Sequence, residues 1–306
     1  MFTPSYLKLY ETGELEKRVR RLNKILESCE LCPRKCRVNR CSGQKGYCKS
    51  GKELVISSYG LHFGEEPEIT GRNGSGTLFL ANCNLLCLYC QNYEISHLGQ
   101  GAEISFESAA DILLHLQKQG CHNINFVTPT HFTPQLVKVI SIAAGKGLKL
   151  PLFWNCSGYE NVETLRLLDG IVDIYKPDIK YSGCTPANKY SNAPDYFERC
   201  QEAVREMYRQ VGDLQSDNRG IAQRGLLVRH LVLPSNLAGS EKVLDFLAKE
   251  ISKDCYVNIM AQYRPCGKAG EYPELNRRPT LPEYVRVINY ARKLGLHRGF
   301  DVQRTL

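Results

Sequence analysis

Short apolar runs alternate with amphipathic stretches from residue 76 onward. The runs are rich in strand-forming residues and are bounded by turn-forming residues, so each predicts a buried strand. They span residues 76–82, 123–128, 150–155, 171–175, 226–232 and 256–260. Between them, apolar residues recur at helical spacing, as in residues 105–119 and 194–211. Strands that alternate with helices form parallel βα units, so the pattern predicts an α/β fold, a partial (β/α)6 barrel that lacks two units of a closed eight-fold barrel.

The beginning of the chain follows a different pattern. Apolar residues between Leu15 and Leu26 share one helical face, and Thr12 is expected to cap that helix. A polar stretch rich in cysteine comes next. We therefore expect two units: an N-terminal helix with a cysteine-rich metal-binding segment over residues 1–60, and the partial barrel over residues 74–306.

The 306-residue chain carries a net charge of +8, and much of the excess lies in the first 52 residues. Lys and Arg are densest in residues 17–21 and 33–37, without the interleaved aromatic residues that stack on bases. The distribution therefore argues against a nucleic-acid partner. A solvated basic helix face explains the charge, and attraction to an acidic protein is the alternative.

Membrane signals are missing from the sequence. No apolar run approaches the length of a transmembrane helix, and the first ten residues lack the basic and then apolar pattern of a targeting segment. We therefore expect a cytoplasmic protein with no membrane partner. In a reducing compartment, 14 cysteines indicate metal or redox chemistry rather than disulfides.

Three cysteines, Cys83, Cys87 and Cys90, directly follow the first predicted strand. Three thiolates can hold three irons of a cubane cluster, and no fourth cysteine stands at a matching offset, so one iron keeps an open position for a substrate or cofactor. A structural zinc site is the alternative, but zinc favours paired C-x2-C hooks and four closed ligands. The carboxyl end of a barrel strand is the active-site end. The loop therefore predicts a catalytic iron–sulfur centre.

A second group of cysteines lies ahead of the barrel: Cys29, Cys32, Cys36, Cys41 and Cys48. Four ligands complete one site, and the most economical set leaves Cys41 as the extra residue. Dense thiolates select zinc or an iron–sulfur cluster, and the sequence leaves both open. Free thiols are the third alternative. Because a complete ligand sphere leaves no reactive position, we expect a structural role for this site.

The C-x3-C-x2-C spacing, with Tyr89 before the last cysteine, resembles the signature of the radical S-adenosylmethionine (SAM) superfamily. Residues 127–131, 155–160, 173–181 and 228–234, taken with the N-terminal cysteines, resemble its pyruvate formate-lyase-activating-enzyme-like branch. The resemblance implies a [4Fe-4S] cluster and SAM as cofactors. It also implies reductive cleavage of SAM to a 5′-deoxyadenosyl radical that abstracts hydrogen from a substrate.

The resemblance also implies a set of SAM contacts. The superfamily's Gly-Gly-Glu turn is replaced here by Thr128-Pro-Thr130, whose carbonyls and hydroxyl are expected to serve instead. Neighbouring strand residues face opposite sides, so Arg229 and His230 cannot both point inward, and we expect Arg229 to do so. The expected cofactor contacts are Tyr89, Thr128, Thr130, Asn155, Ser157, Asp178, Lys180 and Arg229.

The substrate is less constrained by sequence than the chemistry. The resemblance favours a protein or peptide substrate, with activation of a glycyl-radical enzyme as one form of that reaction, and a reductant such as flavodoxin or ferredoxin. Radical modification of a small molecule and a non-catalytic metal-binding adaptor are the alternatives. Substrate contacts are expected from loops such as residues 212–225.

Overall fold

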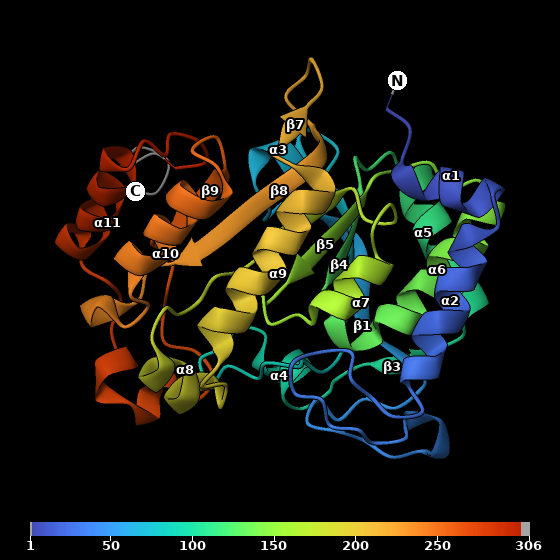
Figure 1. Ribbon diagram of the computed structural model, residues 1–306, viewed down its shortest axis with the longest axis horizontal. Coiled ribbons are helices and arrows are strands. Elements are labelled where there is room, and N and C mark those ends of the chain that lie inside the picture. The colour runs from blue at the N-terminus through green and yellow to red at the C-terminus, as the bar shows by residue number, and fades with distance from the viewer. Residues whose placement is uncertain (1, 301–306) are drawn as a thin grey trace.

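The computed structural model describes residues 2–300 and contains the predicted α/β architecture. Its nine-stranded sheet includes six parallel strands that follow one another across the sheet in chain order, which confirms the six βα units. In Figure 1 these strands form the curved centre of the molecule. They are β2 (Ser75–Leu80), β4 (Ile124–Val127), β5 (Leu152–Cys156), β6 (Ile174–Pro177), β8 (Ala222–Leu231) and β9 (Tyr256–Met260).

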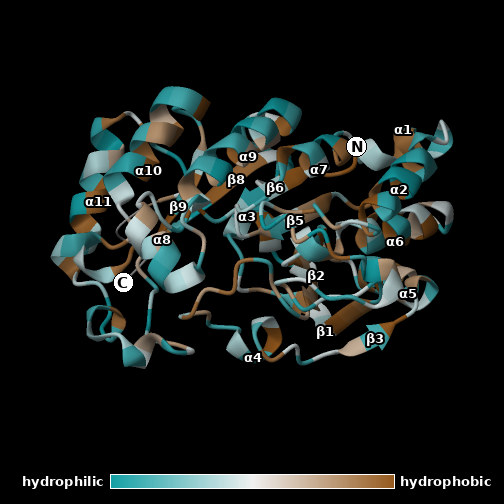
Figure 2. Cartoon of the chain, turned by 60° about the horizontal axis from the view of Figure 1, so that its bottom comes forward, coloured by the Kyte–Doolittle hydropathy of each residue, from teal (hydrophilic) through white to brown (hydrophobic). Residues whose placement is uncertain are grey.

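Helices cover the outer face of the sheet. Figure 2 shows the strands as the apolar centre, with helices that turn hydrophilic surfaces outward. Ser105 caps α5, and Thr280 and Glu283 form a capping box at the start of α11. The helices of the barrel are α5 (Phe106–Lys118), α6 (Thr133–Gly145), α7 (Val162–Leu167), α8 (Cys184–Ser191), α9 (Tyr196–Val211), α10 (Ser240–Phe246) and α11 (Leu281–Lys293).

Three antiparallel strands were not predicted. β1 (Leu54–His62) pairs with β2 on one side and with β3 (Ala102–Ile104) on the other. β7 (Gln215–Ser216) pairs with β8. β1 lies across the end of the N-terminal unit expected at residue 60, so the sheet begins before residue 74. The connection from β1 to β2 carries the short helix α3 (Pro67–Thr70).

The N-terminal helix is broken in two. α1 (Ser5–Glu11) and α2 (Glu14–Ile25) meet at Gly13, whose φ of 71° favours glycine. The expectation that Thr12 caps the start of the helix is wrong, because its hydroxyl donates to the carbonyls of Lys8 and Leu9 and so closes α1. α2 contacts α6, which fixes the N-terminal helices to the barrel.

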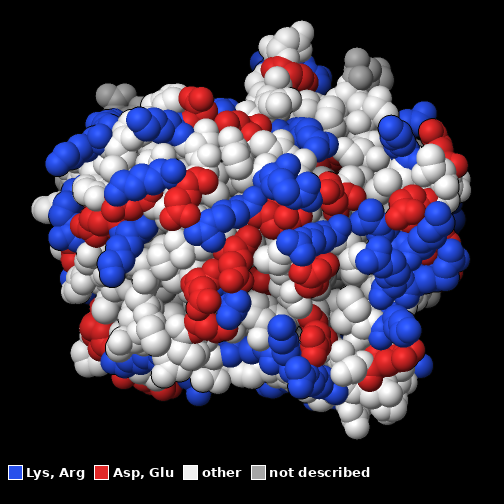
Figure 3. Space-filling view, viewed as in Figure 1, with Lys and Arg blue, Asp and Glu red and all other residues white. Residues whose placement is uncertain are grey.

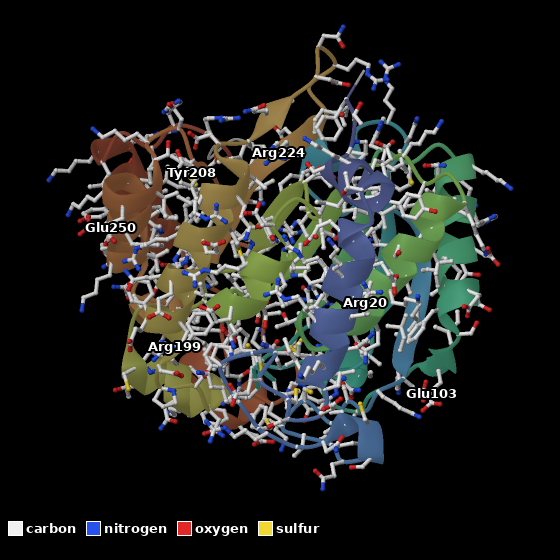
Figure 4. The ribbon with its side chains drawn as sticks, turned by 45° about the vertical axis from the view of Figure 1, so that its right-hand side comes forward. Arg20, Glu103, Arg199, Tyr208, Arg224 and Glu250 are labelled. Carbon is white, nitrogen blue, oxygen red and sulfur yellow. The ribbon has the colours of Figure 1, made fainter. Side chains whose placement is uncertain are left out.

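The two ends of the barrel carry different chemistry. Residues 27–53, between α2 and β1, form a loop beside α4 (Tyr93–Ser96) at the carboxyl ends of the parallel strands (Figure 1). Sulfur atoms gather at this end in Figure 4, whereas Arg224, at the start of β8, lies at the opposite end. Residues 212–225 lead into the start of β8 at that opposite end, so this loop, from which substrate contacts were expected, does not lie beside the cysteines.

Candidate active site at the carboxyl end of the barrel

The cysteine loop, residues 81–92, leaves β2 and turns over the carboxyl end of the sheet. Backbone hydrogen bonds shape it, among them those from Cys90 N to the Cys87 carbonyl and from Leu88 N to the Tyr190 carbonyl. Leu85 N donates to Cys83 Sγ over 3.4 Å. Burial raises the pKa of the Cys83 thiol to about 12, so metal binding has to displace its proton. The loop is thus held in shape by backbone contacts outside its thiols.

One cavity joins the cysteine loop to the strand ends. Its wall contains all three thiols of the loop and five of the eight predicted cofactor contacts. These eight residues are Cys83, Cys87, Cys90, Tyr89, Thr128, Ser157, Lys180 and Arg229. They come from the ends of five parallel strands or the segments that follow them. Five of the predicted cofactor contacts therefore share one recess with the thiols of the cysteine loop.

The thiols of the loop are spread along the cavity wall. Within residues 2–300, no three Cys, His, Asp or Glu side chains converge on a point that would hold one metal ion. A cubane needs no such convergence, because each thiolate binds a different iron. The three thiols on this one cavity wall therefore supply ligands for three irons of a cubane.

Lys180 supplies positive charge beside the loop. Its Nζ lies 2.6 Å from Asp178 Oδ2, so the predicted Asp-x-Lys pair is formed. Burial on its own would lower the pKa of Lys180, but the carboxylate of Asp178 and the thiol of Cys87 raise it. Lys180 is therefore a permanent cation on the cavity wall, and Asp178 orients it from behind.

Tyr89 forms the aromatic side of the loop. Its ring meets those of Tyr181 and Tyr263 edge to face, with centroid distances of 6.2 and 5.7 Å. The ring is 6% exposed, so aromatic packing fixes the residue between the last two cysteines of the loop. Tyr89 can therefore present a rigid apolar surface to a ligand in the cavity.

Three predicted contacts do not line this cavity: Asp178, which lies behind Lys180, and Thr130 and Asn155. Thr130 is fully buried and donates its hydroxyl to Glu160 Oε1 over 2.5 Å. Asn155 directs its side-chain amide to Glu65 Oε1, 3.4 Å away. In both cases the side chain that was expected to contact SAM forms a hydrogen bond with a glutamate of the chain instead. The structure therefore places Thr130 and Asn155 behind the cavity wall.

A pair of glutamates that the sequence analysis missed fills the barrel interior. Glu65 and Glu66 lie on the connection between β1 and β2, which enters the barrel from the end opposite the cysteine loop. Their carboxylates contact inward-facing residues of five parallel strands. These residues are Asn125 of β4, Asn155 of β5, Lys176 of β6, Arg229 of β8 and Asn258 of β9.

The glutamate pair orients the Arg229 side chain and balances its charge. Arg229 points inward as predicted, and its Nε and Nη2 lie 2.6 and 2.8 Å from carboxylate oxygens of Glu66 and Glu65. Burial on its own would raise the pKa of Glu66, but Lys176 and Arg229 lower it to about 2. His230 points the other way and bonds to the Ile179 carbonyl and Ser240 Oγ. Arg229 thus reaches the cavity as a cation whose charge is already balanced.

One sequence signal could have revealed this network. Lys176 lies in the middle of β6 between Tyr175 and Pro177, and a buried strand does not hold a lysine without a counter-ion. Its side chain is fully buried and forms an ion pair with Glu65. The partner itself could not be found from spacing, because it lies 111 residues away along the chain.

Comparison with known proteins identifies the family to which this chain belongs. A family model described as the radical SAM superfamily matches residues 77–210, which include the cysteine loop. An uncharacterised protein of Methanocaldococcus jannaschii is 31% identical over 295 residues, covering 94% of this chain and 81% of its own length. The chain belongs to the radical SAM superfamily. A second uncharacterised protein of the same organism is 21% identical over 291 residues, covering 89% of this chain and 78% of its own.

A solved structure supports the fold assignment. The FeFe-hydrogenase maturase HydG from Carboxydothermus hydrogenoformans superposes with a TM-score of 0.51 at 13% identity, over 75% of this chain and 53% of its own. The chain spans 36–64% of the solved structures that it resembles.

Membership of the superfamily implies a [4Fe-4S] cluster and SAM as cofactors. The described residues fit both groups: three thiols on one cavity wall leave one iron without a cysteine, and Lys180 and Arg229 offer cations to a carboxylate. No described helix is long and apolar enough to cross a membrane.

Proposed function

We propose that this protein cleaves SAM reductively and uses the resulting radical to abstract hydrogen from a protein or peptide substrate, as an activating enzyme does for a glycyl-radical enzyme. The observation that carries this proposal is the single cavity shared by Cys83, Cys87, Cys90 and the polar residues of the strand ends. A non-catalytic adaptor would not need an incomplete thiol set beside a ligand-sized recess.

Each residue of the cavity has a role in this proposal. The cluster, when bound by the three thiolates, supplies the electron that breaks the sulfonium–carbon bond of SAM. Lys180, oriented by Asp178, and Arg229, oriented by Glu65 and Glu66, hold the SAM carboxylate and neighbouring polar groups. Thr128 and Ser157 offer hydroxyls and carbonyls from the ends of β4 and β5. Tyr89 shields one side of the cavity from water.

The shape of the interior supports a substrate larger than a metabolite. A second cavity, lined by Glu65, Glu66 and Asn258, adjoins the first, and Arg229, Met260 and Gln262 line both. The two cavities therefore lie side by side along β9 and share part of their walls. An extended segment of a protein substrate would enter such a recess more readily than a globular surface would.

The state of the thiols supports a reducing compartment. All 14 cysteines lie in the described residues and are free of disulfides, including six that are buried. We place the reaction in the cytoplasm, where thiols persist, with a flavodoxin or ferredoxin as reductant. This environment also preserves oxygen-sensitive clusters.

The proposal is tested with the protein reconstituted anaerobically with iron and sulfide. After dithionite reduction, SAM and glycyl peptides deuterated at Cα are added, and 5′-deoxyadenosine is analysed by mass spectrometry. We expect 5′-deoxyadenosine that contains deuterium. Cleavage without deuterium transfer would contradict the peptide substrate, and absence of cleavage by a loaded cluster would contradict the radical chemistry. Cys184→Ala, which alters an exposed thiol at the start of α8, is the control.

A further inference from the structure

Four cysteines of the N-terminal loop surround an enclosed space that is separate from the two cavities described above. Cys29, Cys32, Cys36 and Cys48 line it, and the fifth cysteine, Cys41, is exposed and lies outside it. The loop is folded closely around these thiols. A Cβ at position 46 would lie 2.9 Å from both Cβ and Sγ of Cys36, so only glycine fits there. The structure thus separates four ligands from the one that the sequence analysis set aside.

Hydrogen-bond donors point at the sulfurs of this space. Tyr47 N donates to Cys36 Sγ over 3.4 Å, and Arg40 Nη1 lies 4.0 Å from Cys29 Sγ. Arg40 is 1% exposed, which is rare for an arginine and requires partners for its charge. It donates to the carbonyls of Gly51 and His131. Amide and cationic donors to sulfur stabilise a reduced iron–sulfur cluster.

Short contacts connect this space to the catalytic cysteine loop. Arg34 donates to the carbonyls of Asn84 and Leu85. These two residues lie between Cys83 and Cys87, the first two cysteines of the catalytic loop. Arg40 also bonds the His131 carbonyl, and His131 Nε2 lies 2.8 Å from the Ala81 carbonyl at the start of the same loop. The two groups of cysteines are therefore neighbours at one end of the barrel, although the strands β1 and β2 and the helix α3 separate them in sequence.

The surface of the N-terminal loop is basic. Its exposed cations are Lys35, Arg37, Lys45, Lys49 and Lys52, of which Arg37 pairs with Glu30 and Lys52 with Glu53. Figure 3 shows Lys and Arg side chains on this part of the surface, at the lower right. Such a surface attracts a small acidic electron-transfer protein and speeds its association. Cys29, Cys36 and Cys48 are half-buried, so the enclosed space lies close beneath this surface.

We propose that Cys29, Cys32, Cys36 and Cys48 bind a second [4Fe-4S] cluster, through which electrons reach the catalytic cluster. This inference rests on the proposed function for the fate of the electron. An acidic flavodoxin or ferredoxin gives one electron to the second cluster, which passes it to the first. The electron is consumed when the sulfonium–carbon bond of SAM breaks into methionine and the 5′-deoxyadenosyl radical. Four thiolates close the second cluster, so it transfers electrons without binding a ligand.

The metal content tests the site directly. Full-length protein reconstituted anaerobically should hold about eight irons and about eight sulfides per chain, because each [4Fe-4S] cluster holds four of each. Cys48→Ser should lose about half of this iron, whereas Cys41→Ser should lose none. The triple variant Cys83→Ala/Cys87→Ala/Cys90→Ala should keep the second cluster, which covers the case in which Cys48→Ser fails to fold. Zinc at the N-terminal cysteines, or a triple variant free of iron, would overturn the proposal.

Electron delivery tests the role of the site. With flavodoxin as reductant, Cys48→Ser should lose most of the rate of SAM cleavage while the iron of the catalytic cluster and SAM binding stay at their original values. An unchanged rate would overturn the relay. Wild-type protein reduced by dithionite separates this result from failure of the proposed function, because SAM cleavage there depends on the catalytic cluster alone.

Discussion

The two groups of cysteines differ in the number of thiols and in what lies beside them. The catalytic loop contributes three thiols to a cavity that continues past Lys180 and Arg229, whereas the N-terminal loop encloses four thiols in a space with no polar recess beyond it. A cubane on three thiolates keeps one iron available for SAM, and a cubane on four does not. The comparison teaches that ligand count and neighbouring space together assign different tasks to chemically similar residues.

The largest effect is expected from removing one thiol of the catalytic loop, which should leave the N-terminal group of cysteines unaffected. Cys87→Ala leaves two thiolates in the catalytic loop, so SAM cleavage and the iron of this cluster should be lost together. The N-terminal cluster should remain. Iron analysis and 5′-deoxyadenosine detection check both statements, with Cys184→Ala as the matched cysteine control. Retained cleavage in Cys87→Ala would remove the basis for calling this loop catalytic.

Arg229 tests what lies beside the catalytic group. Arg229→Ala leaves Glu65 and Glu66 with Lys176 as their remaining cation, and removing one partner from a buried ion pair costs about 3–5 kcal/mol of stability. SAM affinity should fall as well, because the cavity loses its guanidinium. Urea unfolding and equilibrium binding measure the two effects. Arg219→Ala, which removes an exposed partner of Asp217, should change neither quantity.

Arg34 tests the connection between the two groups. Its guanidinium bonds the Asn84, Leu85 and Ser191 carbonyls at 3.2, 3.4 and 2.8 Å, so Arg34→Ala leaves these carbonyls without their donor. We expect a stability loss of about 1.5–3 kcal/mol, the usual range for hydrogen bonds to a charged group. Arg37→Ala, on the same loop but paired only with exposed Glu30, is the control. Equal unfolding curves for the two variants would show that the groups are not coupled through Arg34.

The last expected effect is seen only as a change with pH and concerns a carboxyl group beside the N-terminal thiols. Burial raises the pKa of Glu160 to about 8, so the folded protein holds a proton there that the unfolded chain releases above its ordinary pKa of 4.5. Glu160 therefore stabilises the fold at low pH, and this contribution is lost as pH rises from about 5 to about 8. Glu160→Gln should flatten the decline in unfolding free energy over this range. An unaltered decline, equal to that of exposed Glu163→Gln, would exclude Glu160 as its source.

Local sequence signals were enough to predict part of the fold and part of the site. The six parallel strands and the cysteine loop were predictable, because apolar runs and dense thiols are local signals. Arg229 was predictable as an inward-facing residue from the alternation along its strand. The separation of Cys41 from the other N-terminal cysteines followed from ligand counting.

The network inside the barrel was not predictable in the same way. Glu65 meets Lys176 and Arg229 across 111 and 164 residues, and no spacing rule links positions so distant. Thr130 was misassigned because its partner, Glu160, follows a different strand. Both cases concern polar side chains that satisfy each other in the interior, where long-range packing decides the partner.

The most direct test of the central claim is Mössbauer spectroscopy of the full-length protein reconstituted with ⁵⁷Fe, before and after addition of SAM. The account predicts two [4Fe-4S] clusters, with a change on SAM addition confined to one iron of one cluster. The same change should be missing from the triple variant of Cys83, Cys87 and Cys90. A spectrum in which SAM alters neither cluster, or alters the cluster that remains in the triple variant, would contradict the assignment of one open and one closed centre.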